Sequence, residues 1–165
     1  MEASLLDVVH SKRLEEVVTW PGCLLAILGD VARGMTYLHW NEMLHRDLKP
    51  ANVLIAESWT AKVADFGAAY VARTHARAGA VHGTPPYMAP EMIRRESYGR
   101  AVDVWSFGCV VAHVGARLPP FAELGAQASA EQIMDAVVEG VRTPVDLLSR
   151  VQCPPPLLQD RKSVV

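Results

Sequence analysis

The sequence is organised around Met43-Leu44-His45-Arg46-Asp47-Leu48-Lys49-Pro50-Ala51-Asn52-Val53-Leu54-Ile55, a polar segment between two short apolar runs. Pro50 disfavours a regular helix here, because proline lacks a backbone N–H and restricts the residue before it. The carboxylate of Asp47 and the amide of Asn52 are therefore expected to face one cleft. This pattern predicts an active-site loop.

A β-hairpin is predicted directly after this loop. Residues 53–55 and 61–64 have the composition of short strands, and residues 57–60 have that of a turn. The hairpin would bring Asp65, in Asp65-Phe66-Gly67, back beside Asn52. Two such oxygen ligands with a nearby carboxylate suit a magnesium ion bound to a phosphate ester, because Mg²⁺ prefers hard oxygen ligands.

Three motifs then occur in order: His45-Arg46-Asp47-Leu48-Lys49-Pro50-Ala51-Asn52, Asp65-Phe66-Gly67 and Ala89-Pro90-Glu91. Together they resemble the catalytic loop, the magnesium loop and the end of the activation segment of eukaryotic protein kinases, most of all the tyrosine-kinase-like serine/threonine kinases. One such tripeptide often arises by chance, but three in register rarely do. The resemblance implies a mainly α fold with a small β-hairpin (α+β), as in a truncated kinase large lobe over residues 1–160 with a tail at 161–165.

The resemblance also implies a role for each matching residue. Asp47 would orient the substrate hydroxyl, and Lys49 and Thr84 would complete the catalytic group. The residues implied to contact ATP are Lys49, Asn52, Leu54 and Asp65, and those implied to hold Mg²⁺ are Asn52 and Asp65. Regulatory or structural roles are implied for His45, Arg46, Phe66, Gly67, Glu91 and Asp103.

Several of these structural roles are specific enough to check. Asp103 is expected to bond the backbone around His45-Arg46-Asp47, and His45 and Phe66 are expected to be packing residues. Arg46 resembles the arginine that grips a phosphorylated activation loop, for which Thr74 is a weak candidate. Glu91 pairs in such kinases with an arginine near the end of the domain, but the chain closes with residues 161–165 and no recognisable family sequence.

Four helical segments are expected from periodicity and capping signals. A short helix should follow Ser4, and a longer one should follow Thr19. A nearly all-apolar helix should begin at Asp103 and lie in the middle of the domain, and a last helix over residues 130–139 should be capped by Ser129. Residues 68–82 have the composition of a mobile loop. The core positions expected on the second helix are Leu24, Leu28, Val31, Met35 and Leu38.

Composition narrows the function classes. The chain has 165 residues, is half hydrophobic and carries a net charge of −2, so neither a nucleic-acid surface nor a basic membrane surface is indicated. No apolar run reaches the length of a membrane helix, and the start has no signal-peptide pattern, so a cytoplasmic protein is expected. The three cysteines are expected to be free thiols. No chemistry is assigned to His10, His39, His75, His82 and His113.

Two function classes follow from what the 165 residues contain. The first is a protein kinase that transfers the γ-phosphate of ATP to serine or threonine hydroxyls of protein substrates, using Mg²⁺. The second is a non-catalytic, kinase-derived binding module, because the sequence holds no G-x-G phosphate loop and only Lys12 precedes the catalytic loop. The small lobe and the last helices are therefore expected to be absent. The sequence indicates no oligomeric state.

Overall fold

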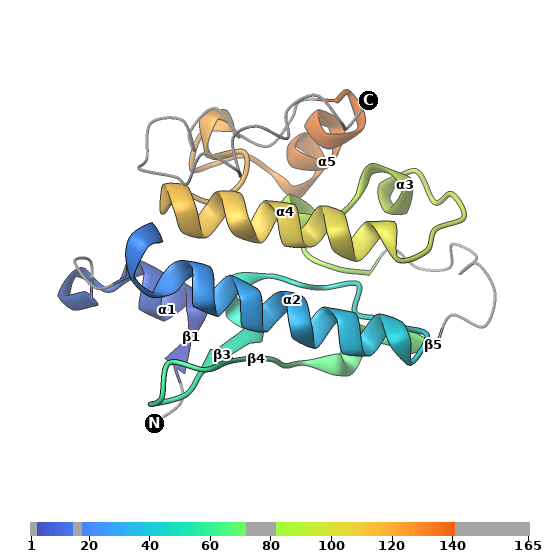
Figure 1. Cartoon of the computed structure of the whole chain (residues 1–165). Helices are drawn as coiled ribbons and strands as arrows, with labels where there is room; N and C mark the ends of the chain where they lie inside the picture. The colour runs from blue at the N-terminus through green and yellow to red at the C-terminus, as the bar shows by residue number, and fades with distance from the viewer. Residues whose placement is uncertain (1–2, 15–17, 72–81, 141–165) are drawn as a thin grey trace.

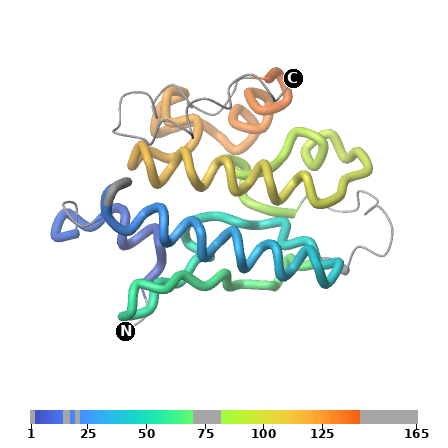
Figure 2. Tube along the Cα trace, in the orientation of Figure 1, coloured from blue at the N-terminus to red at the C-terminus, as the bar shows by residue number. Residues whose placement is uncertain are grey.

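Two helices of 16 residues form the centre of the molecule in the computed structural model, which describes residues 3–14, 18–71 and 82–140. Helix α2 (Leu25–Trp40) lies alongside α4 (Ala101–Ala116), and a small sheet lies on the other side of α2 (Figure 1). The tube view follows the same path of the chain (Figure 2). The mainly α fold with a small β-hairpin is confirmed.

The N-terminal segment packs against this sheet. Strand β1 (Ala3–Ser4) pairs with the hairpin, and α1 (Leu5–His10) follows at once. The Ser4 hydroxyl accepts the Asp7 N–H, and the Asp7 carboxylate accepts the Ser4 N–H, so the helix begins with a reciprocal capping box. A 3-10 turn, Lys12–Leu14, follows α1.

All five expected core positions are buried in one large cluster, four of them on α2 and the fifth, Leu24, directly before it. Helix α2 is preceded by a π-helical turn (Trp20–Leu24) with a kink at Gly22, and Thr19 stands at the cap position without a side-chain cap bond. The helix approaches the sheet closely, because a Cβ on Gly34 would lie 3.1 Å from Val63 Cγ2. Glycine at 34 therefore permits this packing.

The hairpin has the expected register. Strands β3 (Val53–Ile55) and β4 (Ala61–Val63) are antiparallel, with Val53 opposite Val63. A second, unexpected pair joins β2 (Met43–Leu44) to β5 (Tyr70–Val71). The expectation that the mobile loop begins at Ala68 was therefore wrong, because this backbone pairing fixes Tyr70 and Val71. Residues 72–81 lie outside the described part.

Helix α4 carries most of the remaining core. Its buried residues include Val102, Cys109 and Val110, whereas Val104 is exposed. Trp105 contacts all three hydrophobic clusters of the described residues. In that part of the chain no helix is long and apolar enough to cross a membrane.

Two short helices lie on the far side of α4 from α2 (Figure 1). They are α3 (Pro90–Ile93) and α5 (Ala130–Val138). The Ser129 cap of α5 is confirmed, and Gln132 completes a capping box there. Short 3-10 turns at Pro50–Asn52, Phe66–Ala68, Pro85–Tyr87 and Ala122–Leu124 complete the described elements.

Candidate active site

Asp47 lies at the centre of a closed hydrogen-bonded group. Its Oδ1 accepts the Thr84 hydroxyl at 2.7 Å, and its Oδ2 accepts the Lys49 ammonium at 2.8 Å. Lys49 Nζ also donates to Thr84 Oγ1 at 2.8 Å, so the three side chains form a ring. With 16% of its side chain exposed, Asp47 is held in one orientation but remains reachable from the cleft.

Gly83 lets Thr84 come this close to the loop. Its φ is +116°, and a Cβ there would lie 2.8 Å from the Arg46 carbonyl oxygen. Any side chain would push the Gly83–Thr84 backbone away from the catalytic loop. The position of the Thr84 hydroxyl thus depends on a glycine before it.

Asp103, in the first turn of α4, holds the backbone of the catalytic loop. Its Oδ2 accepts the His45 N–H at 2.9 Å, and its Oδ1 accepts the Arg46 N–H at 2.8 Å. His39 Nε2 on α2 donates to the same Oδ2 at 2.8 Å. Because the Asp103 side chain is fully buried, these three donors replace the water that an exposed carboxylate would bind. The expected backbone bonds of Asp103 are thus present.

His45 and Arg46 hold the loop against the chain on either side of Asp65. The fully buried His45 donates through Nε2 to the Ala64 carbonyl at 3.0 Å, and its Nδ1 accepts the Asp47 N–H at 3.3 Å. Arg46 adopts a left-handed φ of 67°, and its Nε donates to the Ala68 carbonyl at 2.6 Å. Thr74, the candidate phosphosite for this arginine, lies outside the described residues.

Asn52 and Asp65 are the oxygen ligands available for a divalent cation. Asn52 donates twice through Nδ2, to the Asp47 carbonyl oxygen at 2.9 Å and to Asp47 Oδ2 at 3.2 Å. Its Oδ1 accepts no hydrogen bond within the described part, so it is available to a metal. The Ala64 N–H bonds the Asn52 carbonyl at 2.9 Å, which puts the exposed Asp65 one residue beyond this contact.

This donor set fits Mg²⁺ that keeps water and phosphate oxygens. Two side-chain oxygens form only part of a shell, as is usual for Mg²⁺ at nucleotide sites. The described residues hold no group of three or more His, Cys, Asp or Glu side chains placed to bind a metal ion.

The remaining site residues differ in burial. Leu54 alternates with the buried Val53 and Ile55, so its half-buried side chain faces the other side of the sheet. The expectation that Phe66 packs is wrong in part: its ring centroid lies 5.8 Å from that of His45, yet 48% of the residue is exposed. Within the described part no larger element covers it.

Two other expected positions remain open to solvent or only partly buried. The Gly67 N–H donates to Asp65 Oδ1 at 3.3 Å and helps to fix the turn. Glu91 is half-buried, and its carboxylate has no hydrogen bond or ion pair with the described residues. The arginine at 161 falls outside them.

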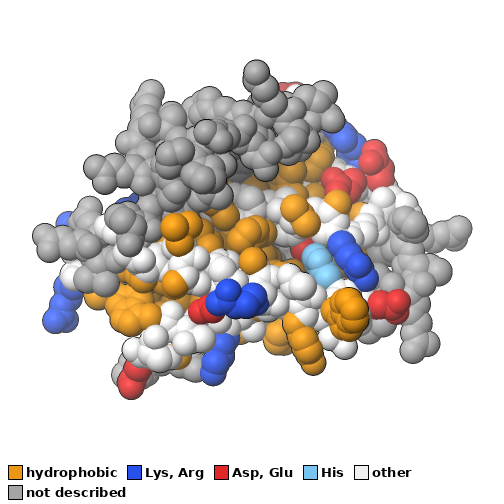
Figure 3. Space-filling view, viewed as in Figure 1, with side chains coloured by type: hydrophobic (Ala, Val, Ile, Leu, Met, Phe, Trp, Pro, Cys, Tyr) orange, Lys and Arg blue, Asp and Glu red, His pale blue; other side chains and the backbone are white. Residues whose placement is uncertain are grey.

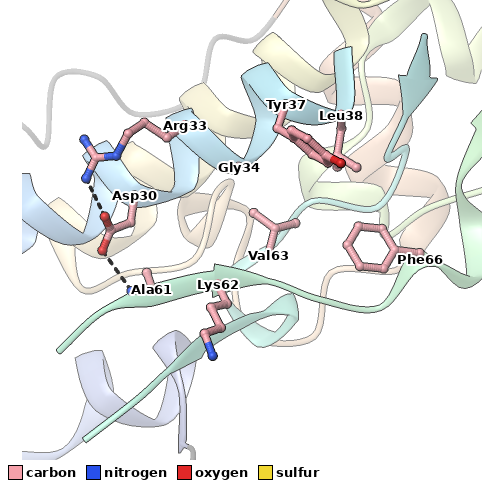
Figure 4. Close-up of a pocket in the computed structure, with 9 residues that line it drawn as sticks. All are labelled: Asp30, Arg33, Gly34, Tyr37, Leu38, Ala61, Lys62, Val63 and Phe66. Atoms are coloured by element: carbon pink, nitrogen blue, oxygen red, sulfur yellow. Dashed lines mark hydrogen bonds and ion pairs between the residues drawn. The ribbon is translucent and has the colours of Figure 1, made fainter. Parts of the chain in front are cut away.

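An open groove of about 550 Å³ lies between α2 and β4, next to Phe66. Tyr37, Val63 and Phe66 face this space, whereas Lys62 points away from α2 (Figure 4). Asp30 closes one end, where it pairs with Arg33 and accepts the Ala61 N–H at 3.0 Å. Hydrophobic side chains are also visible on the face of the molecule that Figure 3 shows. Three hydrophobic residues of α2 are exposed: Leu25 at 47%, Tyr37 at 69% and Trp40 at 84%.

Sequence reasoning missed the partners of three histidines. His39 bonds Asp103, and His10 bonds His113, which in turn bonds the Tyr87 hydroxyl. Their spacing of 64 and 103 residues gave no local signal. The position of His10 at the end of α1 and of His113 on the buried α4 was visible, but only their packing brings the rings together.

Comparisons with known proteins show the family of the chain. A family model of the protein kinase domain matches residues 4–156. Mitogen-activated protein kinase kinase kinase 3 of Mus musculus is 44% identical over 103 residues, 60% of this chain and 16% of that protein. The probable serine/threonine-protein kinase drkD of Dictyostelium discoideum is 36% identical over 154 residues, 92% of this chain and 11% of that protein.

A third relative, the serine/threonine-protein kinase fused of Drosophila melanogaster, is 42% identical over 97 residues, which cover 58% of this chain and 12% of the relative. The chain thus spans less than a fifth of the length of each of these three curated relatives. Since the family model covers nearly all of its residues, the chain belongs to the protein kinase domain family and is by family a protein serine/threonine kinase.

Proposed function

We propose that this chain supplies the catalytic loop of an enzyme that transfers the γ-phosphate of ATP to serine and threonine hydroxyls of proteins. The observation that carries the proposal is the ring formed by Asp47, Lys49 and Thr84. A carboxylate with both oxygens engaged and some exposure is suited to accept the hydrogen bond of an incoming hydroxyl and to orient it.

Lys49 and Thr84 would act on the two sides of this carboxylate. Two of the three Lys49 N–H groups are used by Asp47 and Thr84, and the third is available to an oxygen of the transferred group. Thr84 fixes Asp47 Oδ1 and lies at the start of the Pro85–Tyr87 turn, where a peptide substrate would dock. A short serine or threonine side chain suits a base held this close to the docking segment.

Asn52 and Asp65 would hold Mg²⁺, and Lys49, Asn52, Leu54 and Asp65 would contact ATP. When bound, the metal supplies charge neutralisation on the phosphate oxygens. Asn52 also orients the base, because its Nδ2 donates to both the backbone and the side chain of Asp47.

A kinase needs further groups to grip the nucleotide, and these 165 residues contain no G-x-G loop for that purpose. We therefore expect the chain alone to transfer no phosphate. The test joins the chain behind the small lobe of a related serine/threonine kinase and follows transfer from labelled ATP with Mg²⁺ to serine, threonine and tyrosine peptides.

Phosphoserine or phosphothreonine is expected, with a loss of about 100-fold or more in kcat for Asp47→Ala. Asp135→Ala is the matched control, because Asp135 is an exposed carboxylate on α5. Thr84→Ala should lower transfer as well. Phosphotyrosine as the main product would refute the substrate class, and the absence of any transfer would favour the alternative, a non-catalytic binding module.

A further inference from the structure

We infer that His10, His113 and Tyr87 form a hydrogen-bonded relay through which protonation of His10, at the surface, changes how the turn carrying Thr84 is held. The inference deepens the proposed function, because it concerns the regulation of the same site. Its physical basis does not depend on phosphate transfer.

The relay joins three elements of the fold. His113, on α4 and only 3% exposed, has its Nδ1 2.7 Å from the Tyr87 hydroxyl. Its Nε2 lies 3.1 Å from Nε2 of His10, the exposed last residue of α1. The Tyr87 and His113 rings are stacked with centroids 6.2 Å apart, and the two histidine rings meet edge to face. A continuous path therefore leads from solvent to a buried hydroxyl.

Tyr87 connects this path to the active site. It ends the Pro85–Tyr87 turn, and its N–H donates to the Thr84 carbonyl at 2.9 Å. Its own carbonyl accepts the Ser106 hydroxyl at 2.7 Å, so the turn is tied to α4 at two points. Because Thr84 bonds Asp47 and Lys49, a displacement of Tyr87 would alter the ring around the base.

Protonation of His10 would change which atom donates in each contact of the relay. A contact between two Nε2 atoms holds one hydrogen, so one histidine donates and the other accepts. When His10 is neutral, Tyr87 can donate to His113 Nδ1, and His113 Nε2 then donates to His10. When His10 is protonated it must donate, so His113 carries its hydrogen on Nδ1, and Tyr87 becomes the acceptor.

In the protonated state the Tyr87 hydroxyl hydrogen loses its acceptor. His113 Nδ1 is the one partner of this hydroxyl among the described residues. A buried donor without an acceptor is unfavourable, so the protonated relay favours a shift of Tyr87 and its turn.

Burial keeps His113, the middle member of the relay, neutral. Burial, with a smaller contribution from His10, lowers the pKa of His113 to about 4, so His113 stays neutral near physiological pH. Burial also raises the pKa of Tyr87, to which Cys109 and Asp47 add. Arg117, after the end of α4, donates to the Val9 and Val18 carbonyls, so a cation bonds the backbone of the residue before His10.

Hydrogen exchange measured by mass spectrometry at micromolar concentration tests the relay in the full chain. Between about pH 7.5 and pH 5.5, where histidine titrates, protection of the Tyr87 amide should fall roughly fivefold after correction for intrinsic exchange, as for the loss of one hydrogen bond. His10→Gln should abolish this change. His82→Gln, which removes an exposed histidine two residues before Thr84, should leave it intact.

Tyr87→Phe keeps the ring and removes the hydroxyl, so it should abolish the change as well. The inference is overturned if the change persists in His10→Gln, if it disappears in His82→Gln instead, or if the wild-type chain shows none. Because this readout requires no ATP, a failure of phosphate transfer leaves the result unaffected, and the two proposals fail separately.

Discussion

The catalytic loop and the Asp65 turn are neighbours, joined by the bond from Arg46 to the Ala68 carbonyl, but they are held in opposite ways. Asp47 makes hydrogen bonds to three side chains, and the buried Asp103 fixes the backbone before it. Asp65 and Phe66 are exposed, and among the described residues the Asp65 carboxylate accepts one hydrogen bond, from the Gly67 N–H. The described residues therefore set the position of the base by themselves, whereas the turn is fixed mainly through its backbone.

The largest difference in the free energy of unfolding is expected between a substitution of Asp103, which is buried, and the same substitution of Asp65. Asp103→Asn replaces one carboxylate oxygen by an NH₂ group that faces His39 or a backbone N–H, and it should lower the free energy of unfolding by about 3–5 kcal/mol. Asp65→Asn, at an exposed left-handed position that asparagine tolerates, should change it by less than about 0.5 kcal/mol. Urea denaturation of both variants measures the difference, and equal losses would contradict it.

This contrast also marks how far sequence reasoning reached. The hairpin, the Ser4 and Ser129 caps and the buried face of α2 depend on neighbours in the chain, and local patterns predicted them correctly. The pairing of Tyr70 with Leu44 and the His10 contact with His113 depend on segments far apart in the sequence. No local pattern encodes such contacts, so only the packed structure reveals them.

For the candidate site, the motifs predicted the loop and the hairpin but did not predict every residue that holds them in place. The hairpin was predicted, and it brings Ala64, one residue before Asp65, to the Asn52 carbonyl. The third donor to Asp103 was not predicted, because His39 belongs to a different helix and has no motif of its own.

Low pH should also lower the free energy of unfolding, through His113 on the buried face of α4. The folded-state pKa of His113, about 4, lies below its ordinary value of 6.5, so the unfolded chain takes up this proton first as the pH falls. Stability is complete above about pH 6.5 and should decrease by about 3 kcal/mol by pH 4, at 1.36 kcal/mol for each pKa unit. Denaturant midpoints across this range measure it.

The matched comparison for this prediction is His113→Gln against His82→Gln, the control variant already used for the relay. The first should flatten the acid dependence, even if it lowers stability at neutral pH, and the second should not. An unchanged slope in His113→Gln would show that other groups carry the acid sensitivity.

The smallest effect on stability is expected in the groove. Tyr37→Ser combined with Phe66→Ser, at positions 69% and 48% exposed, should change the free energy of unfolding by no more than about 1 kcal/mol. The same double variant should reduce self-association, because exposed apolar patches promote it. Light scattering and urea denaturation test both points, with Val31→Ala at a fully buried position as the control that must lose stability.

The bonds from Asp103 to the loop backbone also have a consequence during synthesis of the chain. The anchor lies 58 and 57 residues after the two amides that it binds, so the ribosome makes the loop before its anchor. At 5–20 residues per second, roughly 3 to 12 s separate them. Throughout that interval the nascent polypeptide carries the complete His45-Arg46-Asp47 motif without the carboxylate that shapes it.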